Sequence, residues 1–168
     1  MNSRASSDVI TRVLHGVVEP FVPTVTMMVY YGNHRLINGS ELRLSVAEIT
    51  PRVLIGGEHD ELYTLIMIDP DAPNPDEPAL REVVTWIVTN IPGGESSTQG
   101  NEFMSYDVPN PQVGVHRHIM LLFRQRGPLN GIETLESRVH FRTRDFANTH
   151  NLDNPVGVAY FNVRRQAS

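Results

Sequence analysis

Two short stretches of the sequence concentrate side chains that can do chemistry, and the first is a loop rich in aspartate and proline. Residues 69–78 read DPDAPNPDEP and directly follow an apolar run. The four prolines fix the backbone and remove amide donors, so Asp69 and Asp71 are held rigidly at the end of a predicted strand. The carboxylates then either orient donors or polarise a histidine at the rim of a site, or they accept amides in a plain surface turn. A calcium loop fits poorly, because its sixth position is Asn74 and its twelfth is Leu80.

The second stretch, Gly114-Val115-His116-Arg117-His118, opens a strongly apolar run. On a strand, His116 and His118 share one face and Arg117 takes the other. The two histidines could ligate a transition metal, or a histidine beside an aspartate could bind an anion or act as an acid–base catalyst, or both could be ordinary polar residues at a strand end. No third metal ligand stands at a readable spacing, and no Ser or Thr stands beside His116 as a nucleophile. We therefore expect no catalytic residue, no metal and no cofactor.

Composition narrows the class of protein further. The 168 residues fit one domain over 1–168, and the absence of cysteine excludes disulfides and thiolate chemistry. The net charge of −5 argues against direct nucleic-acid binding, which needs a positive field. The first residues are polar, and no apolar run reaches the roughly 18 residues of a membrane span. We expect an intracellular monomer that does not insert into membranes.

The remaining sequence predicts a mainly β fold, an antiparallel two-sheet sandwich with short peripheral helices, because short apolar runs alternate with 12 prolines and 12 glycines. Leu62–Ile68 and Ile119–Phe123 are nearly continuously apolar, so we place them centrally with both faces buried. Gly32-Asn33 and Asn38-Gly39 predict turns, and the second also predicts a hairpin. The expected strands are 24–31, Arg52–Ile55, Leu62–Ile68, Val83–Ile91, Phe103–Tyr106, Val115–Phe123 and Gly157–Val163.

Two helices are expected outside the sheets. Apolar residues recur at helical spacing over 10–17, with a cap at Ser7 or Asp8 and an end at Pro20. A second helix is predicted over Arg144–His150, with Thr143 as its cap and an aspartate in its positive first turn.

Taken together, these motifs resemble one protein family. Residues 69–73 are similar to the first signature of the phosphatidylethanolamine-binding proteins, and residues 114–117 are similar to the second. Within the plant flowering-regulator branch of that family, residues 60–63 and 91–94 resemble the class named MOTHER OF FT AND TFL1, whose sister classes are FLOWERING LOCUS T and TERMINAL FLOWER 1. The plant branch also shows in Tyr63-Thr64-Leu65, Leu80-Arg81-Glu82, Trp86–Pro92, Gly100-Asn101-Glu102, Leu122–Gln125 and Thr143–Ala147.

The resemblance implies a sandwich of two antiparallel sheets with a small anion pocket at one end. In this sequence Asp69, Asp71, Pro73, Pro109 and His116 would line the pocket. The resemblance also implies a non-catalytic adaptor that joins 14-3-3 proteins and basic-zipper transcription factors, in cytoplasm and nucleus, to modulate flowering or seed germination. The alternative is a binder or sensor of a phosphorylated small molecule or phospholipid headgroup. A weak hydrolase using His116 and Asp71 ranks last, because no activated nucleophile is evident.

One departure from the family pattern affects the pocket. Thr85 stands before the strand tryptophan, where the family has histidine. Either this change weakens the anion pocket, or His118 supplies the missing ring from the face that it shares with His116. We favour the first interpretation, because His118 can share that face and still point past the pocket.

A second departure affects the expected partner surface. The resemblance implies that florigens contact 14-3-3 proteins through an arginine, a proline, a phenylalanine and an arginine of the external lid. The matching positions here are Asp60, Pro92, Gln99 and Pro128, so only the proline is retained. Asp60 reverses a charge opposite an acidic groove, and Gln99 lacks an aromatic anchor. We therefore expect weaker direct binding to 14-3-3 than a florigen shows.

Overall fold

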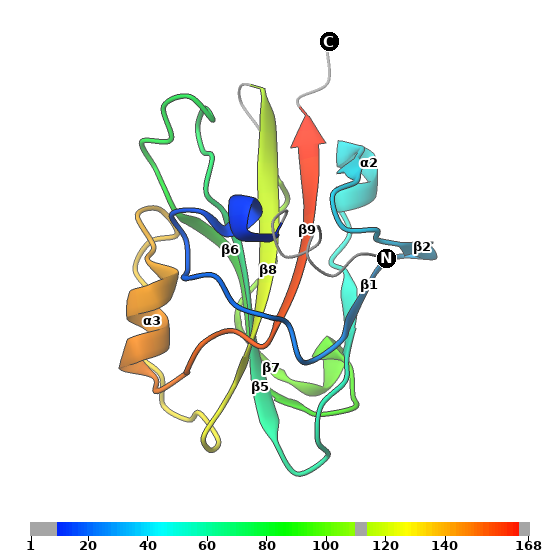
Figure 1. Cartoon of the computed structure of the whole chain (residues 1–168), viewed down its shortest axis with the longest axis vertical. Helices are drawn as coiled ribbons and strands as arrows, with labels where there is room; N and C mark the ends of the chain where they lie inside the picture. Colours follow the sequence, from blue (N-terminus) through cyan, green and yellow to red (C-terminus); the bar gives the residue numbers. More distant parts are fainter. Residues whose placement is uncertain (1–9, 110–113, 165–168) are drawn as a thin grey trace.

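A computed structural model of the chain describes residues 10–109 and 114–164, and it contains two β-sheets (Figure 1). The smaller sheet has three strands in the order β2-β1-β4, and the larger has six in the order β3-β9-β8-β5-β6-β7. The strands are β1 (Met27–Tyr31), β2 (His34–Arg35), β3 (Glu41–Leu42), β4 (Arg52–Ile55), β5 (Leu62–Asp69), β6 (Val83–Pro92), β7 (Asn101–Met104), β8 (Val115–Arg124) and β9 (Gly157–Arg164). The helices are a segment over 10–14, α2 (Leu44–Ala47), the 3-10 turn η1 (Ser97–Gln99) and α3 (Thr143–Thr149).

The prediction that two apolar strands lie centrally is confirmed. β5 pairs with both β6 and β8, and its residues from Tyr63 to Ile68 are fully buried. Such strands read as continuous apolar runs because side chains on both faces leave water. Every pairing in the large sheet is antiparallel except that of β3 with β9, which is parallel.

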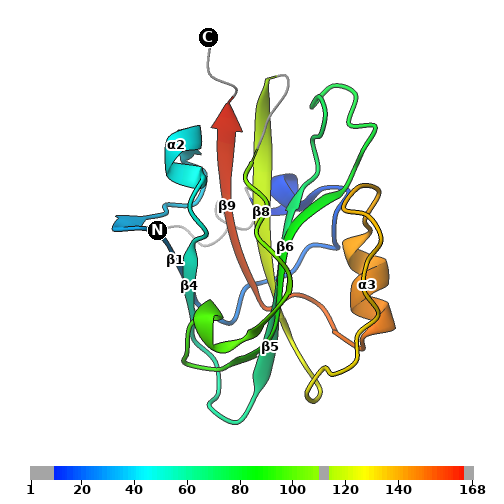
Figure 2. The same ribbon diagram turned by 180° about the vertical axis from the view of Figure 1, so that it is seen from behind.

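Apolar side chains form a core on each face of the large sheet. One core fills the space between the two sheets and includes Trp86 and Phe161. The other lies under the N-terminal segment and α3, where Leu14 and Phe146 pack on the outer face of β5 and β8. Figures 1 and 2 show the N-terminal segment and α3 against the large sheet. Alternate residues of β5 and β8 therefore face different cores, which decides where each site residue points.

Two strand-level expectations were wrong in detail. Asn38-Gly39 is a turn, but it does not close a hairpin, because it carries the chain from β2 in the small sheet to β3 in the large one. The two-residue hairpin is at Gly32-Asn33, between the paired residues Tyr31 and His34. The strand predicted at Phe103–Tyr106 lies two residues earlier, at β7. Tyr106 instead leaves the sheet and donates its hydroxyl to the carbonyl of Ala47.

The helix predictions also need correction. The described part of the first helix covers 10–14, and the chain then turns well before Pro20, while the proposed caps at Ser7 and Asp8 lie outside the described residues. In α3, Thr143 is the first helical residue rather than the cap, and the cap position is Arg142, which makes no side-chain capping bond. The hydroxyl and amide of Thr143 instead both donate to the buried carboxyl group of Glu82 at the start of β6. A residue distant in sequence therefore performs the capping.

Candidate functional site at the Asp69 end of the sandwich

The aspartate loop begins where β5 ends, and its two carboxylates bind neighbouring residues of β8 that point to opposite faces of that strand. Asp69 is the last residue of β5, and its Oδ1 accepts the amide of Asp71 at 2.8 Å, which closes a tight turn. Asp69 is 7% exposed and Asp71 is 5% exposed, so neither is a plain surface residue. The surface-turn interpretation is therefore insufficient, since buried carboxylates require partners.

Asp69 holds His116 between the sheets. The Oδ2 atom of Asp69 lies 2.8 Å from Nδ1 of His116, whose ring is 1% exposed. With Asp69 ionised, its oxygens only accept, so Nδ1 of His116 is the donor in this bond. The hydrogen bond between Asp69 and His116 fixes the orientation of the imidazole near the start of β8.

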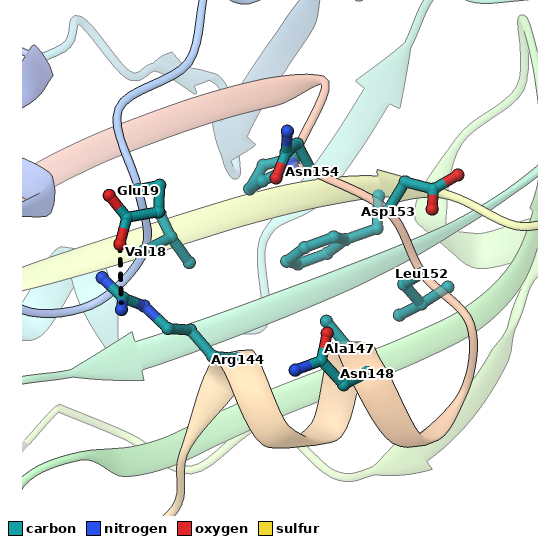
Figure 3. A pocket seen from close by; sticks show the side chains of 10 residues that line it. Val18, Glu19, Arg144, Ala147, Asn148, Leu152, Asp153 and Asn154 are labelled. Atoms are coloured by element: carbon teal, nitrogen blue, oxygen red, sulfur yellow. Dashed lines mark ion pairs between the residues drawn. The ribbon is translucent and has the colours of Figure 1, made fainter.

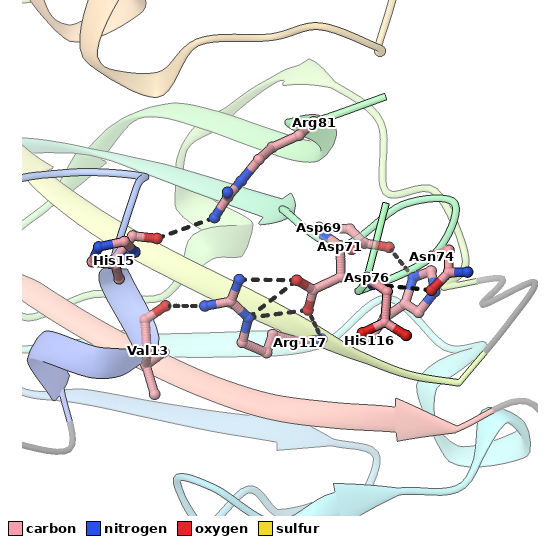
Figure 4. A network of polar contacts seen from close by, with 9 residues as sticks. All are labelled: Val13, His15, Asp69, Asp71, Asn74, Asp76, Arg81, His116 and Arg117. Carbon is pink, nitrogen blue, oxygen red and sulfur yellow. Dashed lines mark hydrogen bonds and ion pairs between the residues drawn. The ribbon is translucent and has the colours of Figure 1, made fainter. Parts of the chain in front are cut away.

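Asp71 points to the other face and binds Arg117. The guanidinium donates from Nε to Oδ2 at 3.0 Å and from Nη2 to Oδ1 at 2.9 Å, and the Arg117 amide adds a bond to Oδ2 at 2.7 Å (Figure 4). Burial alone raises the pKa of Asp71, but the hydrogen bonds and charge of Arg117 outweigh it and hold the pKa below its ordinary value. Sequence reasoning placed Arg117 on the opposite face from His116 and gave it no role. An arginine on a partly buried strand face needs a carboxylate partner, and this requirement could have paired Arg117 with Asp71.

His118 lies two residues along β8, on the same face as His116. Its ring is 1% exposed and stacks on Phe161 with centroids 5.3 Å apart, and neither ring nitrogen has a hydrogen-bond partner among the described residues. Burial lowers the pKa of His118 from 6.5 to about 4, and the charge of Asp69 opposes that effect only in part. The ring is therefore a neutral imidazole at pH 7.

The remaining pocket candidates lie near this end, on the neighbouring strand and loops. Thr85 is 5% exposed and its hydroxyl donates to the carbonyl of Met67 at 3.2 Å, so the hydroxyl proton is already used in a hydrogen bond within the sheet. The carbonyl of Thr85 accepts the amide of Asp107 at 2.8 Å, which brings the segment containing the buried Pro109 beside β6. Pro73 is half-buried in the aspartate loop and follows a cis peptide bond.

The four candidate partner residues gather at the opposite end of the sandwich. Leu62 at the start of β5 pairs with Pro92 at the end of β6, and Asp60 precedes that strand by two residues. Pro128 lies beside Leu129, whose amide donates to the side chain of Asn90 on β6. Asp60, Gln99 and Pro128 are exposed, and Pro92 is half-buried. The aspartate loop and this surface are thus separated by the length of β5.

Two cavities lie away from the Asp69 end. One of about 390 Å³ is lined by Val18, Phe123, Leu152 and neighbours under α3, with Arg144 and Glu19 forming a 3.1 Å ion pair at its rim (Figure 3). Another of about 570 Å³ lies between residues 133–142 and α3. Arg138, which lies in the segment beside this second cavity, donates instead to backbone carbonyls of β6.

Within residues 10–109 and 114–164, no group of three or more His, Asp or Glu side chains is arranged to hold a metal ion. No helix in those ranges is long and apolar enough to cross a bilayer.

The comparisons with known proteins identify the family. The family model for phosphatidylethanolamine-binding protein matches residues 35–161. The chain therefore belongs to the phosphatidylethanolamine-binding protein family, as its two signature-like motifs predicted.

Curated plant relatives extend the match over nearly the whole chain. Protein MOTHER of FT and TFL1 homolog 2 of Oryza sativa subsp. japonica is 42% identical over 160 residues, covering 94% of this chain and 92% of the relative. Protein FLOWERING LOCUS T of Arabidopsis thaliana is 41% identical over 160 residues, covering 95% and 91%. Protein TERMINAL FLOWER 1 of Arabidopsis thaliana is 43% identical over 158 residues, covering 94% and 89%. The plant-branch resemblance is confirmed, and overall identity does not separate the three classes.

Solved structures confirm the fold. A carboxypeptidase Y inhibitor, complexed with its cognate proteinase, superposes with a TM-score of 0.85 at 20% identity, covering 98% of this chain and 97% of the inhibitor. A phosphatidylethanolamine-binding protein from Plasmodium vivax gives a TM-score of 0.78 at 22% identity, covering 96% and 95%. The two-sheet sandwich is therefore the fold of this family.

Proposed function

We propose that the protein is a non-catalytic regulatory adaptor that modulates flowering or seed germination by joining a 14-3-3 protein and a basic-zipper transcription factor. The observation that carries the proposal is the 41–43% identity to plant proteins named for flowering control, over at least 94% of this chain. The exposed surface formed by Asp60, Gln99 and Pro128 at one end of the sandwich supports an adaptor role, because it is remote from the buried aspartate loop.

The geometry at Asp69 supports a role without catalysis. Asp69 and His116 form a carboxylate–imidazole pair of the kind that activates a nucleophile in hydrolases. A hydrolase also needs a hydroxyl or thiol in reach, and the hydroxyl of Thr85 donates to a backbone carbonyl instead. Arg117, the cation of the motif, is committed to Asp71.

The adaptor proposal is tested by reconstitution. The chain, a plant 14-3-3 protein and a phosphorylated basic-zipper C-terminal peptide are mixed at concentrations far above micromolar, and their assembly is measured by sedimentation equilibrium. We expect a ternary species whose amount falls when Pro92→Asp places a charge in the proposed surface. Glu48→Arg, an exposed charge change beside α2 at the other end of the molecule, is the control and should form the complex normally. A chain that does not associate with 14-3-3 at these concentrations, with or without the peptide, contradicts the proposal.

A second candidate function is the binding of a small oxyanion at the Asp69 end. It is favoured by one specific observation: the buried His118 ring near the Asp69–His116 pair has two nitrogens without a partner in the part of the chain that the structure describes. Buried polar groups in folded proteins are normally satisfied, so an unsatisfied imidazole next to a site calls for a ligand or water.

A further inference from the structure

The side-chain amides of Asn90 and Gln125 bind each other at the end of the sandwich that carries the candidate partner residues. Nε2 of Gln125 donates to Oδ1 of Asn90 at 2.8 Å, and the backbone amide of Asn90 donates to Oε1 of Gln125 at 2.8 Å. The hydroxyl of Thr64 on β5 donates to the same Oε1 at 2.7 Å. Gln125 is 5% exposed, and buried polar side chains that satisfy one another in this way fix a single local arrangement.

The pair holds the turn that contains Pro128 from both sides. Oδ1 of Asn90 accepts the amide of Leu129 at 2.8 Å, and Nδ2 of Asn90 donates to the carbonyl of Leu129 at 2.8 Å. Nε2 of Gln125 also donates to the carbonyl of Gly127 at 3.0 Å. Because a backbone amide can only donate, the bond from Leu129 fixes which way the carboxamide of Asn90 faces. Pro128 has no amide proton of its own, so the bonds to its two neighbours determine its position.

Asn90 also reaches the segment that carries Gln99. Its Nδ2 atom donates to Oδ1 of Asn101 at 2.9 Å, and Asn101, the first residue of β7, stands two residues after Gln99. Asn90 has a φ of 57°, in the left-handed region that asparagine adopts more readily than most other residues. The position therefore suits asparagine both for its backbone and for the two bonds that its Nδ2 atom donates.

The remaining two partner residues are joined to the pair through the strand ends. The backbone amide of Gln125 donates to the carbonyl of Leu62 at 2.8 Å, and Asp60 stands two residues before Leu62. Pro92 pairs with Leu62 across β5 and β6, and it stands two residues after Asn90. The four partner residues come from separate stretches of the chain, yet each lies within two residues of Asn90 itself or of a residue bonded to the pair.

We propose that Asn90 and Gln125 are positioning residues of the partner surface, and that their paired carboxamides hold its four segments in one arrangement before a partner arrives. The inference rests on the proposed adaptor function and adds the device that preorganises its surface. Segments that are already ordered lose little conformational freedom on binding, so preorganisation increases affinity. Breaking the pair should therefore weaken assembly although none of the four partner residues is changed.

Two variants break the pair in different ways. Asn90→Gly keeps the left-handed backbone and removes the carboxamide. Gln125→Glu keeps the acceptor Oε1 and replaces the donor Nε2 by an oxygen that faces Oδ1 of Asn90 and the carbonyl of Gly127. Asp153→Asn is the control, because it removes the exposed ion pair with Arg126, next to the same turn, and leaves the carboxamides intact.

Assembly of the full chain with the 14-3-3 protein and the phosphorylated peptide is measured by sedimentation equilibrium at concentrations far above micromolar. We expect Asn90→Gly and Gln125→Glu each to weaken association about tenfold, and Asp153→Asn to behave as the wild type. The variant that combines Asn90→Gly with Gln125→Glu should lose no more than either single change, because the two side chains act as one unit.

NMR spectra of the free chain distinguish positioning from a local effect. Within the described part of the chain, the side chain of Gln125 is hydrogen-bonded to residues 97–101 only through Asn90. Gln125→Glu should nevertheless shift the amide signals of 97–101, and Asn90→Gly should shift those of 60–62. In the wild type, the amides of Asn90 and Leu129 should exchange with solvent through one shared opening, with the same dependence on denaturant. The exchange measurement uses the wild type, so it decides the question even if a variant folds poorly.

Shifts confined to residues that touch the changed side chain, or separate opening of the two amides, overturn the inference. Equal association by the wild type and by both pair variants also overturns it and leaves the adaptor function standing. No association by the wild type overturns the adaptor function, and the role proposed here for the pair in binding falls with it.

Discussion

Arg117 connects the aspartate loop to the N-terminal segment through a single guanidinium. Nε and Nη2 bind the carboxylate of Asp71, while Nη1 donates to the carbonyl of Val13 at 2.7 Å. Val13 lies near the end of the 10–14 helix, where carbonyls lack partners within the helix. Arg81 at the base of the same loop donates to the carbonyl of His15 at 3.1 Å (Figure 4). The motif that orients His116 therefore also fastens the segment covering the outer core.

Removing the charge of Asp71 should loosen that segment. Asp71→Asn leaves Arg117 without its charged partner in a partly buried position, and we expect a loss of about 2–3 kcal/mol in the free energy of unfolding. Hydrogen exchange should rise first in residues 10–19, because Arg117 holds the carbonyl of Val13 in that segment. Asp76→Asn, an exposed aspartate of the same loop, is the control and should change little. Unchanged exchange in residues 10–19 of Asp71→Asn would contradict the connection.

The stability of the protein should fall in mild acid because of His118. Folded His118 takes up a proton only near pH 4, whereas the unfolded chain does so near 6.5, so the unfolded state binds more protons between these values. Stability therefore decreases as pH falls through that window, and the wild type should lose about 2 kcal/mol more than His118→Phe between pH 7 and pH 5. Urea titrations in sulfate- and phosphate-free buffer measure the difference. Parallel stability curves for the two proteins would show that His118 titrates normally.

Glu82 should stabilise α3 because its side-chain oxygen accepts hydrogen bonds from Thr143, and not because the carboxylate is charged. Burial raises the pKa of Glu82, and the two bonds from Thr143 lower it only in part. A raised carboxyl pKa means that stability is lost as pH rises above the ordinary value of 4.5. Glu82→Gln keeps the acceptor oxygen and should be no less stable at pH 7.5, while Thr143→Val should cost about 1–3 kcal/mol. Thermal unfolding checks both, and equal losses in the two variants would refute the acceptor role.

Restoring histidine at position 85 should improve anion binding at neutral pH. The Thr85 hydroxyl is engaged with the carbonyl of Met67, so it offers the pocket no proton. An imidazole at this position adds a charge-assisted donor, and phosphate affinity in Thr85→His should rise about ten- to a hundred-fold, more so as pH falls through ~6.5. Thr85→Val is the matched control and should bind as weakly as the wild type. Equal phosphate affinity in wild type and Thr85→His would exclude Thr85 as the cause of a weak pocket.

Local patterns in the sequence predicted the large sheet well and the connections poorly. β5 and β8 were predictable because burial of both faces leaves nearly continuous apolar runs at Leu62–Ile68 and Ile119–Phe123. The two-residue strands β2 and β3 carry no periodicity that could reveal them. Asn38-Gly39 predicts a turn from backbone preference alone, whereas the strand that follows it is chosen by pairing with β9, more than 100 residues away.

The sequence indicated which residues lie at the candidate site, but it did not indicate which of them form hydrogen bonds with each other. The spacing of His116 and His118 placed both rings on one face, which the structure bears out through their shared burial between the sheets. Asp69 and Asp71 are two residues apart yet serve opposite faces, because the chain turns between them. Partners such as Arg117 with Val13, and Glu82 with Thr143, are separated by long stretches of chain and leave no local signal.

In the proposed adaptor role, we expect direct contact with 14-3-3 to be weak because of two residues. Asp60 and Gln99 are exposed at the end of the sandwich where Pro92 closes β6. Calorimetric titration of the chain into a 14-3-3 protein tests the claim most directly. We predict an affinity weaker than micromolar for the wild type, at least tenfold tighter binding for Asp60→Arg with Gln99→Phe, and no gain for Glu48→Arg. Submicromolar binding by the wild type, or no gain in the double variant, would contradict the account.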